Sequence, residues 1–423
     1  MNFVCAHRTD VGKIRDNNED HFISVPELRL FVVADGMGGH NAGEVASQKT
    51  CEVIQRHIEE NREVLEQFNQ SHRSKDLQSV SKLLAAAVEH ASKVVYRMAG
   101  KNKEQRGMGC TCTALLLLDD GKGVLAHVGD SRLYMLRRGR VHQLTEDHTF
   151  VGDLLKRGMI TPEQAHDHPN GNVLTRAVGV QANLVVDTMI FDLDPGDVFL
   201  LCSDGLHGYF ENDSALLPYF DKPDLQEVID DLINFTLSQG ANDNVTALAV
   251  LMSPMPGEDY IAAEERLAIL KKVPLFSHLK YNELVKVLGL TENRTVAAQT
   301  ELLTEGERGS ELFILLDGAV DVLKAGDVIA NLEPGVHIGE MALVDNAPRS
   351  ATIRTQAECH VLSISRPDFF TLIRAEPVIA TKLLWSFVQV MSTRLRDTND
   401  ALLEARTEEL DDDSFEILFD DDE

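Results

Sequence analysis

The feature that most constrains this chain is a set of short apolar runs that each border an aspartate. The run LFVVA ends on Asp35 and leads into a glycine-rich turn, LFVVADGMGGH. An apolar run of this length bounded by glycine is typical of a buried strand. VLAHVG precedes Asp130, FLLCS precedes Asp204, and VTALAVLM closely follows Asp243. Carboxylates at the ends of neighbouring core strands can meet at one edge of a sheet, where they repel each other unless cations intervene.

Composition limits the partners that we expect. The net charge of −28 over 423 residues argues against nucleic acid or an anionic membrane, because both require basic patches. No basic-then-apolar leader opens the chain and no apolar run approaches the roughly 20 residues that span a bilayer, so we expect a cytoplasmic protein. The six scattered cysteines are expected to be reduced and mostly buried.

Helical and strand patterns divide the chain into blocks. The first, 1–253, alternates grouped strands with helices, which predicts an α+β sandwich. Within it we expect helices at 42–68, 77–98 and 224–238, and strands at 30–35, 111–118, 123–131, 132–139, 198–206 and 245–252. The polar stretch 145–172 has the length of a functional flap. Residues 254–268 are predicted to form a linker and the start of a helix.

The second block, 269–405, has many short strands with glycine turns, which is typical of a small jelly roll with flanking helices. Its last helix, from about Pro377 to Ala405, carries apolar residues at alternating four and three spacing. That seam fits a homodimer as well as packing on the helix's own domain. Residues 406–423 include ten acids between Glu408 and Glu423, and we expect this acidic tail to be disordered.

The carboxylates of the first block predict a particular chemistry. Glu19 and Asp20 close its opening polar segment and add to the four strand-end aspartates. Oxygen-only ligands suit Mg²⁺ or Mn²⁺ better than zinc. Two such ions about 3.5–4 Å apart can activate water for in-line attack on phosphorus. Each aspartate alone is more often a turn residue, so the hypothesis depends on the joint pattern.

The order and wording of these segments resemble the metal-dependent serine/threonine protein phosphatases, the PPM or protein phosphatase 2C-like family. The matching words span 1–253: VGKIRDNNED, VVADGMGGH, GCTCTALLL, HVGDSRLY, LTEDHT, NVLTRAVG, LLCSDGL and NDNVTALAV. This resemblance implies a β-sandwich flanked by helices, a phosphorylated protein as substrate, and two Mn²⁺ or Mg²⁺ ions. We expect the substrate to be phosphorylated by a bacterial serine/threonine kinase.

The resemblance also implies roles for residues. Asp35 would bridge both metals, with the Gly36 carbonyl on one of them. The other expected metal residues are Asp204, Asp243 and Asp20, with Asp130 at a third metal; Glu19 would mainly orient bound water.

Two further roles concern the phosphoryl group. Arg15 is the expected phosphate clamp, because a guanidinium offers paired donors. Met37 replaces the histidine that many members use as proton donor, which leaves His40 as the nearest candidate.

The second block resembles a cyclic nucleotide-binding domain through LLTEGERGSELFILLDGAVDVL and IGEMALVDNAPRSATIRT. The resemblance predicts that Arg349 neutralises the cyclic phosphate and that Glu340 accepts from the ribose hydroxyl. Free amides at a helix start would assist, and the remaining expected contacts come from Gly339, Met341, Ala342 and Ser350. Ser350 favours cAMP over cGMP. Trp385, the only tryptophan, is expected in the core.

The sequence therefore predicts a metal-dependent phosphoserine/phosphothreonine protein phosphatase regulated by a cyclic nucleotide. Two alternatives stay open. In one, the phosphatase is active and the second domain is ligand-free and used for dimerisation or targeting. In the other, the protein is a pseudophosphatase scaffold that senses the nucleotide, although such a relative should have lost carboxylates that this chain retains.

Overall fold

The computed structural model describes residues 2–38, 42–71, 73–161, 164, 168–171, 173–253, 262–344 and 347–413. The chain divides into two compact units, Met1–Ala263 and Glu264–Glu423, and each is described by itself. Within the described ranges, no helix has the length and apolar character that a membrane span requires.

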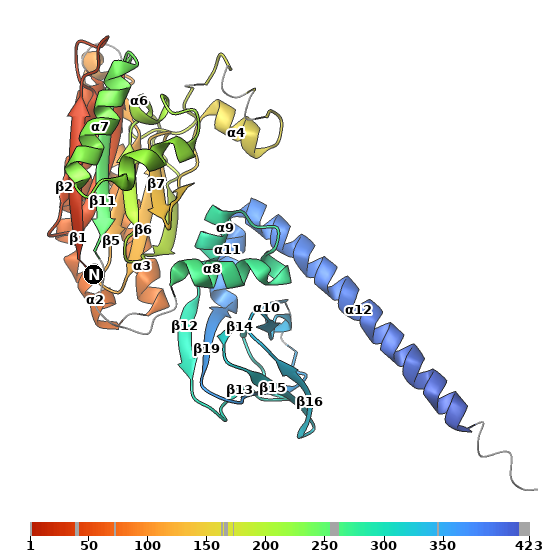
Figure 1. Cartoon of the computed structure of the whole chain (residues 1–423). Coiled ribbons are helices and arrows are strands. Elements are labelled where there is room, and N and C mark those ends of the chain that lie inside the picture. The colour runs from red at the N-terminus through yellow and green to blue at the C-terminus, as the bar shows by residue number, and fades with distance from the viewer. Residues whose placement is uncertain are drawn as a thin grey trace, which may run out of the picture. The chain divides into compact units, whose positions relative to one another are not determined.

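The first unit is built on two antiparallel sheets (Figure 1). Its strands are β1 (Phe3–Asp10), β2 (Asp20–Val25), β3 (Leu30–Met37), β4 (Gly109–Cys110), β5 (Cys112–Leu117), β6 (Lys122–Val128), β7 (Arg132–Arg137), β8 (Arg140–Gln143), β9 (Asp187–Asp192), β10 (Val198–Cys202) and β11 (Val245–Met252). One sheet has the order β1-β11-β10-β7-β8 and the other has β2-β3-β5-β6-β9, with β4 paired to β3.

Helices cover the outer faces of both sheets. Helix α7 (Leu225–Ser238) packs on β1 and β11, while α1 (Gly43–Glu60) and α3 (Ser74–Lys101) pack on the other sheet. Strand β3 is buried on both faces: Leu30, Val32 and Ala34 join the core formed with α1 and α3, and Phe31 meets the Phe3 ring edge-on at 5.5 Å. Burial on both faces explains why this strand has a continuous apolar run.

The predicted helix-flanked sandwich is confirmed, and the differences from prediction are local. The single helix expected at 42–68 is two helices, α1 and α2 (Arg62–Ser71), joined at Asn61. The strand expected at 198–206 ends at Cys202, and the short helix α6 (Asp204–His207) follows. Early in the polar stretch lies the short helix α4 (Phe150–Lys156), which begins where the Thr149 hydroxyl accepts from the Gly152 amide.

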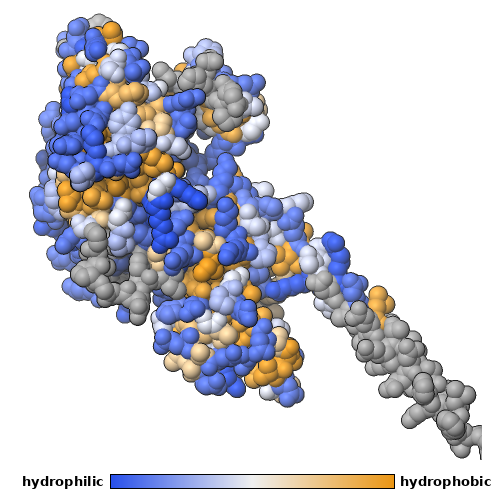
Figure 2. Space-filling view, in the orientation of Figure 1, coloured by the Kyte–Doolittle hydropathy of each residue, from blue (hydrophilic) through white to orange (hydrophobic). Residues whose placement is uncertain are grey.

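The second unit is a barrel of two four-stranded antiparallel sheets with helices before and after it, as predicted. The sheet orders are β12-β19-β14-β17 and β13-β18-β15-β16. The strands are β12 (Glu292–Val296), β13 (Glu301–Leu303), β14 (Glu311–Asp317), β15 (Val320–Lys324), β16 (Asp327–Leu332), β17 (His337–Ile338), β18 (Thr352–Thr355) and β19 (Cys359–Ser365). Figure 2 shows apolar surface at the β15–β16 end, where Val328 and Ile329 are exposed.

The helices of this unit are α8 (Ala263–Lys272), α9 (Tyr281–Leu288), α10 (Met341–Val344), α11 (Arg366–Ala375) and α12 (Pro377–Asp413). Helix α12 continues to Asp413, past the expected end near Ala405, so it includes the first eight residues of the predicted acidic tail. Arg406, Glu408, Glu409 and Leu410 are strong helix formers and continue the helix there. Residues 414–423 lie outside the described part. Trp385 was expected in the core and is instead 60% exposed on α12.

Candidate active site

Four aspartates reach one edge of the sandwich from two pairs of adjacent strands. Asp20 begins β2 and lies directly opposite Asp35 on β3. Asp204 begins α6 just after β10, and Asp243 lies just before β11, which pairs with β10. The expected convergence of strand-end carboxylates is therefore present in the fold.

Asp20 ties the two sheets together. Its carboxylate oxygen Oδ2 accepts hydrogen bonds from the Ser203 hydroxyl at 2.8 Å and the Thr246 hydroxyl at 2.7 Å. Both hydroxyls come from the opposite sheet, beside Asp204 and Asp243. These partners keep Asp20 in one orientation at the site, and neither was anticipated from the sequence, although each lies within three residues of a predicted ligand.

Asn244 is a second residue that the sequence analysis missed. Its side-chain oxygen accepts from the Glu19 amide at 2.8 Å, and its side-chain nitrogen donates to the carbonyls of Val11 and Asn17, each at 2.9 Å. These three bonds fasten the opening segment, which carries Arg15, to the start of β11. The segment NDNVT contains this residue, but the sequence indicated a role only for its aspartate, as a metal ligand.

Two glycines allow the backbone to pack tightly here. An added Cβ on Gly36 would lie 2.4 Å from the Gly43 carbonyl oxygen and 2.5 Å from that of Glu19. One on Gly205 would lie 1.9 Å from the carbonyl oxygen of Asn244. Side chains at these positions would push apart the segments that carry the carboxylates, which accounts for the glycine after Asp35 and Asp204.

The site carries negative charge that the described protein groups do not balance. Burial raises the pKa of Asp20 to about 7, against the hydrogen bonds from its two hydroxyl partners. Burial, then the charge of Asp204, raises the pKa of Asp130 to about 8. The Asp35 pKa is raised well above its usual range by burial and by Asp20 and Asp204, and burial also raises the pKa of Asp204.

The donor groups can be tested for their fit to divalent cations. Asp20 Oδ1 and Asp204 Oδ1 are buried without a hydrogen-bond partner in the described structure. All the converging side-chain donors are carboxylate oxygens, the ligands that Mg²⁺ and Mn²⁺ prefer. Among the described residues, no three His, Cys, Asp or Glu side chains are spaced so that they could hold a metal ion. Asp35 and Asp204 instead lie within hydrogen-bonding distance of each other. Unpartnered acceptors and raised pKa values together fit a site that divalent cations would complete.

Arg15, the predicted phosphate clamp, lies beside these carboxylates. Its Nη2 donates to Asp243 Oδ2 at 2.7 Å, and half of its side chain is exposed. One bond to Asp243 leaves other donors of the guanidinium directed at solvent. The Glu19 carboxylate accepts from the Gly43 amide, and burial and the charge of Glu44 raise its pKa.

A cleft of about 800 Å³ opens over this edge and contains Arg15, Asp130, Asp204 and Asp243 in its lining. Residues of the predicted flap, Thr149 and Leu155 among them, form part of the wall. The arrangement places the flap helix α4 next to the carboxylates, where it can contact a bound substrate.

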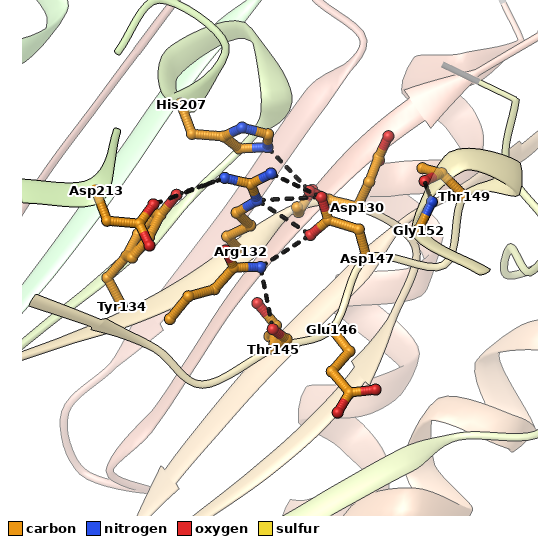
Figure 3. Close-up of polar contacts among 12 residues, drawn as sticks. Asp130, Arg132, Tyr134, Thr145, Glu146, Asp147, Thr149, Gly152, His207 and Asp213 are labelled. Atoms are coloured by element: carbon orange, nitrogen blue, oxygen red, sulfur yellow. Dashed lines mark hydrogen bonds and ion pairs between the residues drawn. The ribbon is translucent and has the colours of Figure 1, made fainter. Parts of the chain in front are cut away.

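A buried polar network supports the floor of the cleft beside Asp130 (Figure 3). Arg132 makes a two-pronged ion pair with Asp147, with its Nη2 2.7 Å from Oδ2, and also donates to the Tyr134 hydroxyl. His207 Nε2 lies 3.0 Å from the Asp130 carbonyl, and burial lowers the His207 pKa to about 4, so this imidazole is neutral and donates. The network fixes Asp130 and the base of the flap.

The predicted proton donor, His40, lies outside the described residues, and its role stays a prediction. His148 is buried and contacts Asp187 and Arg176.

In the second unit, the predicted nucleotide residues gather around α10. Arg349 is buried, and its guanidinium donates to the carbonyls of Gly339 at 3.0 Å and Glu311 at 2.7 Å. Its Nε is buried without a hydrogen-bond partner in the described structure. Glu340 is 4% exposed and forms an ion pair with Arg394 of α12.

The other residues predicted to contact the nucleotide differ from what was expected. The amide of Ala342 already donates to the Gly339 carbonyl, so it is not one of the free amides that were expected. Met341 is 43% exposed, and Ser350 is exposed with its carbonyl accepting from Lys324.

Comparison with known proteins identifies both units. Residues 14–245 match the protein phosphatase 2C family model, and residues 293–376 match the cyclic nucleotide-binding domain model. The chain belongs to the protein phosphatase 2C family. It is a protein serine/threonine phosphatase with a cyclic nucleotide-binding domain in its second unit.

Curated relatives are similar over the phosphatase domain. The serine/threonine phosphatase stp of Listeria monocytogenes is 35% identical over 57% of this chain and 93% of its own length. Protein phosphatase PhpP of Streptococcus pneumoniae is 32% identical over 59% of this chain and 98% of its own length.

Solved structures agree with this assignment. The Mycobacterium tuberculosis phosphatase PstP/Ppp matches with a TM-score of 0.52 at 34% identity, over 60% of this chain and 99% of that chain. A PstP catalytic domain in complex with two manganese ions matches with a TM-score of 0.50 at 33% identity, over 60% of this chain and 99% of that chain.

Replacing one strand-end carboxylate should remove metal binding as well as turnover. We expect Asp204→Asn to reduce Mn²⁺ binding in calorimetry and to lower hydrolysis of an aryl phosphate to below about a hundredth of the wild-type rate, because ligand loss exceeds the effect of losing an outer partner. The matched control is Asp221→Asn, an exposed aspartate of the same unit. Unchanged Mn²⁺ binding in Asp204→Asn would refute the assignment of this carboxylate.

Proposed function

We propose that this protein hydrolyses phosphoserine and phosphothreonine in proteins and that a cyclic nucleotide bound by its second unit regulates this activity. The observation that carries the first part is the meeting of Asp20, Asp35, Asp204 and Asp243 at one edge, with buried acceptors that lack partners. Two Mn²⁺ or Mg²⁺ ions would be held by these residues and the Gly36 carbonyl, with a third at Asp130. The ions would supply charge neutralisation and an activated water.

The chain's own residues would bind and orient the phosphorylated segment. Arg15 would hold the phosphoryl oxygens, since a guanidinium matches their geometry. The cleft would receive the phosphoserine or phosphothreonine side chain, with the flap along one side. A substrate phosphorylated by a bacterial serine/threonine kinase is the proposed partner.

The nucleotide part of the proposal is supported by Arg349 and Glu340. Both are buried, both are charged, and they lie nine residues apart around α10. A buried guanidinium whose Nε has no described partner can gain a hydrogen bond from a cyclic phosphate. The preference for cAMP over cGMP depends on the resemblance at Ser350 alone.

The ion pair between Glu340 and Arg394 supports a route for regulation. A ribose hydroxyl donating to Glu340 would compete with Arg394 for the same buried carboxylate. Helix α12 is also tied to α9, where Lys382 lies 2.7 Å from Glu283. Loss of one of its anchors would change the position or order of α12, a bistable element that ligand binding can shift.

Titration calorimetry with cAMP and cGMP on the full chain tests the nucleotide site. We expect binding of cAMP, weaker binding of cGMP, and a loss of at least about tenfold in affinity in Arg349→Ala, because a charge-assisted contact to phosphate is worth about 1.5–3 kcal/mol.

The control for this experiment is Arg354→Ala, which removes a partly exposed arginine paired with Glu301 and should leave the affinity for nucleotide unchanged. Absence of binding by either nucleotide would favour the ligand-free, targeting interpretation of the second domain. Binding without any effect on phosphatase activity would rule out catalytic regulation.

Replacing Arg394 should increase the affinity of the second unit for the nucleotide. Arg394→Ala frees Glu340, and we expect cAMP affinity to rise about two- to fivefold, since an ion pair with a half-exposed arginine is worth about 0.5–1 kcal/mol. Arg396→Ala is the matched control, because Arg396 contacts only Ser392 of its own helix in the described structure. Weaker binding in Arg394→Ala would mean that this arginine is a nucleotide contact and not a competitor.

We also propose a homodimer formed through α12. Leu384, Val388 and Leu395 are each more than half exposed, and with Met391 they recur at four-three-four spacing. That spacing forms a coiled-coil seam, which one chain alone leaves uncovered. Among the possible partners, a second copy of the same helix matches this seam by construction.

Sedimentation velocity tests the homodimer. Val388→Glu together with Leu395→Glu should shift the protein towards monomer, because a buried charge in the seam is costly. Val328→Glu is the control, as it changes an equally exposed valine on β16. A monomeric wild type, or a dimer unaffected by the seam variant, would overturn this proposal.

A further inference from the structure

A shallow groove lies between α1 and α3, on the helical face of the first unit and outside the catalytic cleft. It measures about 290 Å³. Three apolar side chains, Val53, Val94 and Met98, form part of its lining, and the remaining lining residues are polar or charged: Lys49, Glu52, Arg56, His57, Glu60 and His90. The groove can therefore take one apolar side chain of a peptide with charges on either side.

A basic ridge runs along α3 beside this groove. Lys93, Arg97 and Lys101 are exposed and recur every four residues, so they lie one above another on the same helix face. Lys103 and Arg106 continue the ridge in the segment that follows. None of the five makes an ion pair with another residue of the described chain; Arg97 Nε donates only to the Lys93 carbonyl. Five exposed cations without counter-ions are unexpected in a chain of net charge −28.

The ridge leads directly to the catalytic edge. The segment after α3 runs into β4, whose residues Gly109 and Cys110 pair with Met37 and Gly36 of β3. Met108 packs against Gly38, where an added Cβ would lie 3.2 Å from the Met108 Cα. The eight helical steps from Lys93 to Lys101 span about 12 Å. A peptide of ordinary length can thus occupy the ridge and the cleft together.

The cleft and the ridge differ in the sign of their charge. The cleft is lined by acidic side chains, among them Asp130, Asp147, Asp204, Glu211 and Asp213. An acidic segment next to the phosphorylated residue would be repelled there, whereas the ridge attracts it and directs it to the same edge.

We propose that the ridge (Lys93, Arg97, Lys101, Lys103 and Arg106) and the adjoining groove dock an acidic segment of phosphoprotein substrates, with an apolar side chain in the groove. This inference rests on the proposed phosphatase function and adds the class of substrate: phosphoproteins with acidic residues flanking the phosphorylation site.

The test uses the full chain and two phosphothreonine peptides with the same central residues. One carries a run of glutamates and one leucine in its flank, and the other carries glutamines and serine there. We expect Lys93→Glu/Arg97→Glu/Lys101→Glu to lower kcat/KM for the acidic peptide at least tenfold, mainly through KM. The kcat/KM values for the neutral peptide and for an aryl phosphate should change less than twofold. A gentler Lys93→Gln/Arg97→Gln/Lys101→Gln variant should give an intermediate loss.

Lys75→Glu/Lys82→Glu is the matched control, since it reverses two exposed lysines in the other half of the same helix. The wild-type preference for the acidic peptide should weaken with added salt. An unchanged kcat/KM for the acidic peptide in the triple variant would overturn the docking proposal. So would higher activity on every substrate, because the ridge would then restrain turnover in general and not select an acidic substrate.

The same experiment separates this inference from the proposed function. Wild-type hydrolysis of either peptide tests protein phosphatase activity itself. The ratio between the peptides, and its response to the ridge variants, tests the docking surface.

Discussion

Negative charge gathered at one edge of the sandwich is the constraint on which the rest of the phosphatase unit depends. Asp20 and Asp35 face each other across two strands, and Asp204 approaches them from the second sheet. Burying such carboxylates is costly unless protons or cations compensate. The raised pKa values show the cost, and the unpartnered oxygens show where compensation is missing. Hydroxyls from Ser203 and Thr246, and the clamp made by Asn244, keep the carboxylates together despite their repulsion.

The sequence predicted the phosphatase sandwich and the positions of its carboxylates because both are encoded locally. An apolar run that ends on an aspartate beside a glycine specifies a buried strand and a carboxylate at its end. Four aspartates that border apolar runs, in a fixed order along the chain, indicated the phosphatase family. Partners that come from distant segments have no such pattern. Asn244 holds a segment more than two hundred residues earlier, and nothing near Asn244 in the sequence indicates that contact. The same limit applies to Arg394, whose partner Glu340 lies on another element, and to Trp385, whose exposure depends on how α12 packs.

Charge is distributed unevenly over the phosphatase unit, with an acidic cleft and a basic ridge on separate surfaces. The cleft is acidic and suits cations and the phosphoryl group that they neutralise. The ridge on α3 is basic, and the segment that continues it leads into β4, which pairs with Gly36 and Met37 of β3. The basic ridge would bind an acidic segment of the substrate, and the cleft would hold the phosphorylated residue for hydrolysis. Net charge alone concealed this division, since a value of −28 describes the whole chain and not the face of one helix.

Helix α12 joins two proposals that would otherwise be independent. Arg394, which holds Glu340 at the nucleotide site, is followed directly by Leu395 of the apolar seam. The two side chains lie about 100° apart around the helix, because an α-helix has about 3.6 residues per turn. Rotating or unwinding this turn to release Glu340 therefore also moves the seam. By linkage, a nucleotide that weakens the seam must itself bind less tightly to the dimer, and one that orders the seam must bind it more tightly. If both proposals hold, dimerisation and nucleotide affinity would be coupled through a single turn of α12, whichever direction the coupling takes.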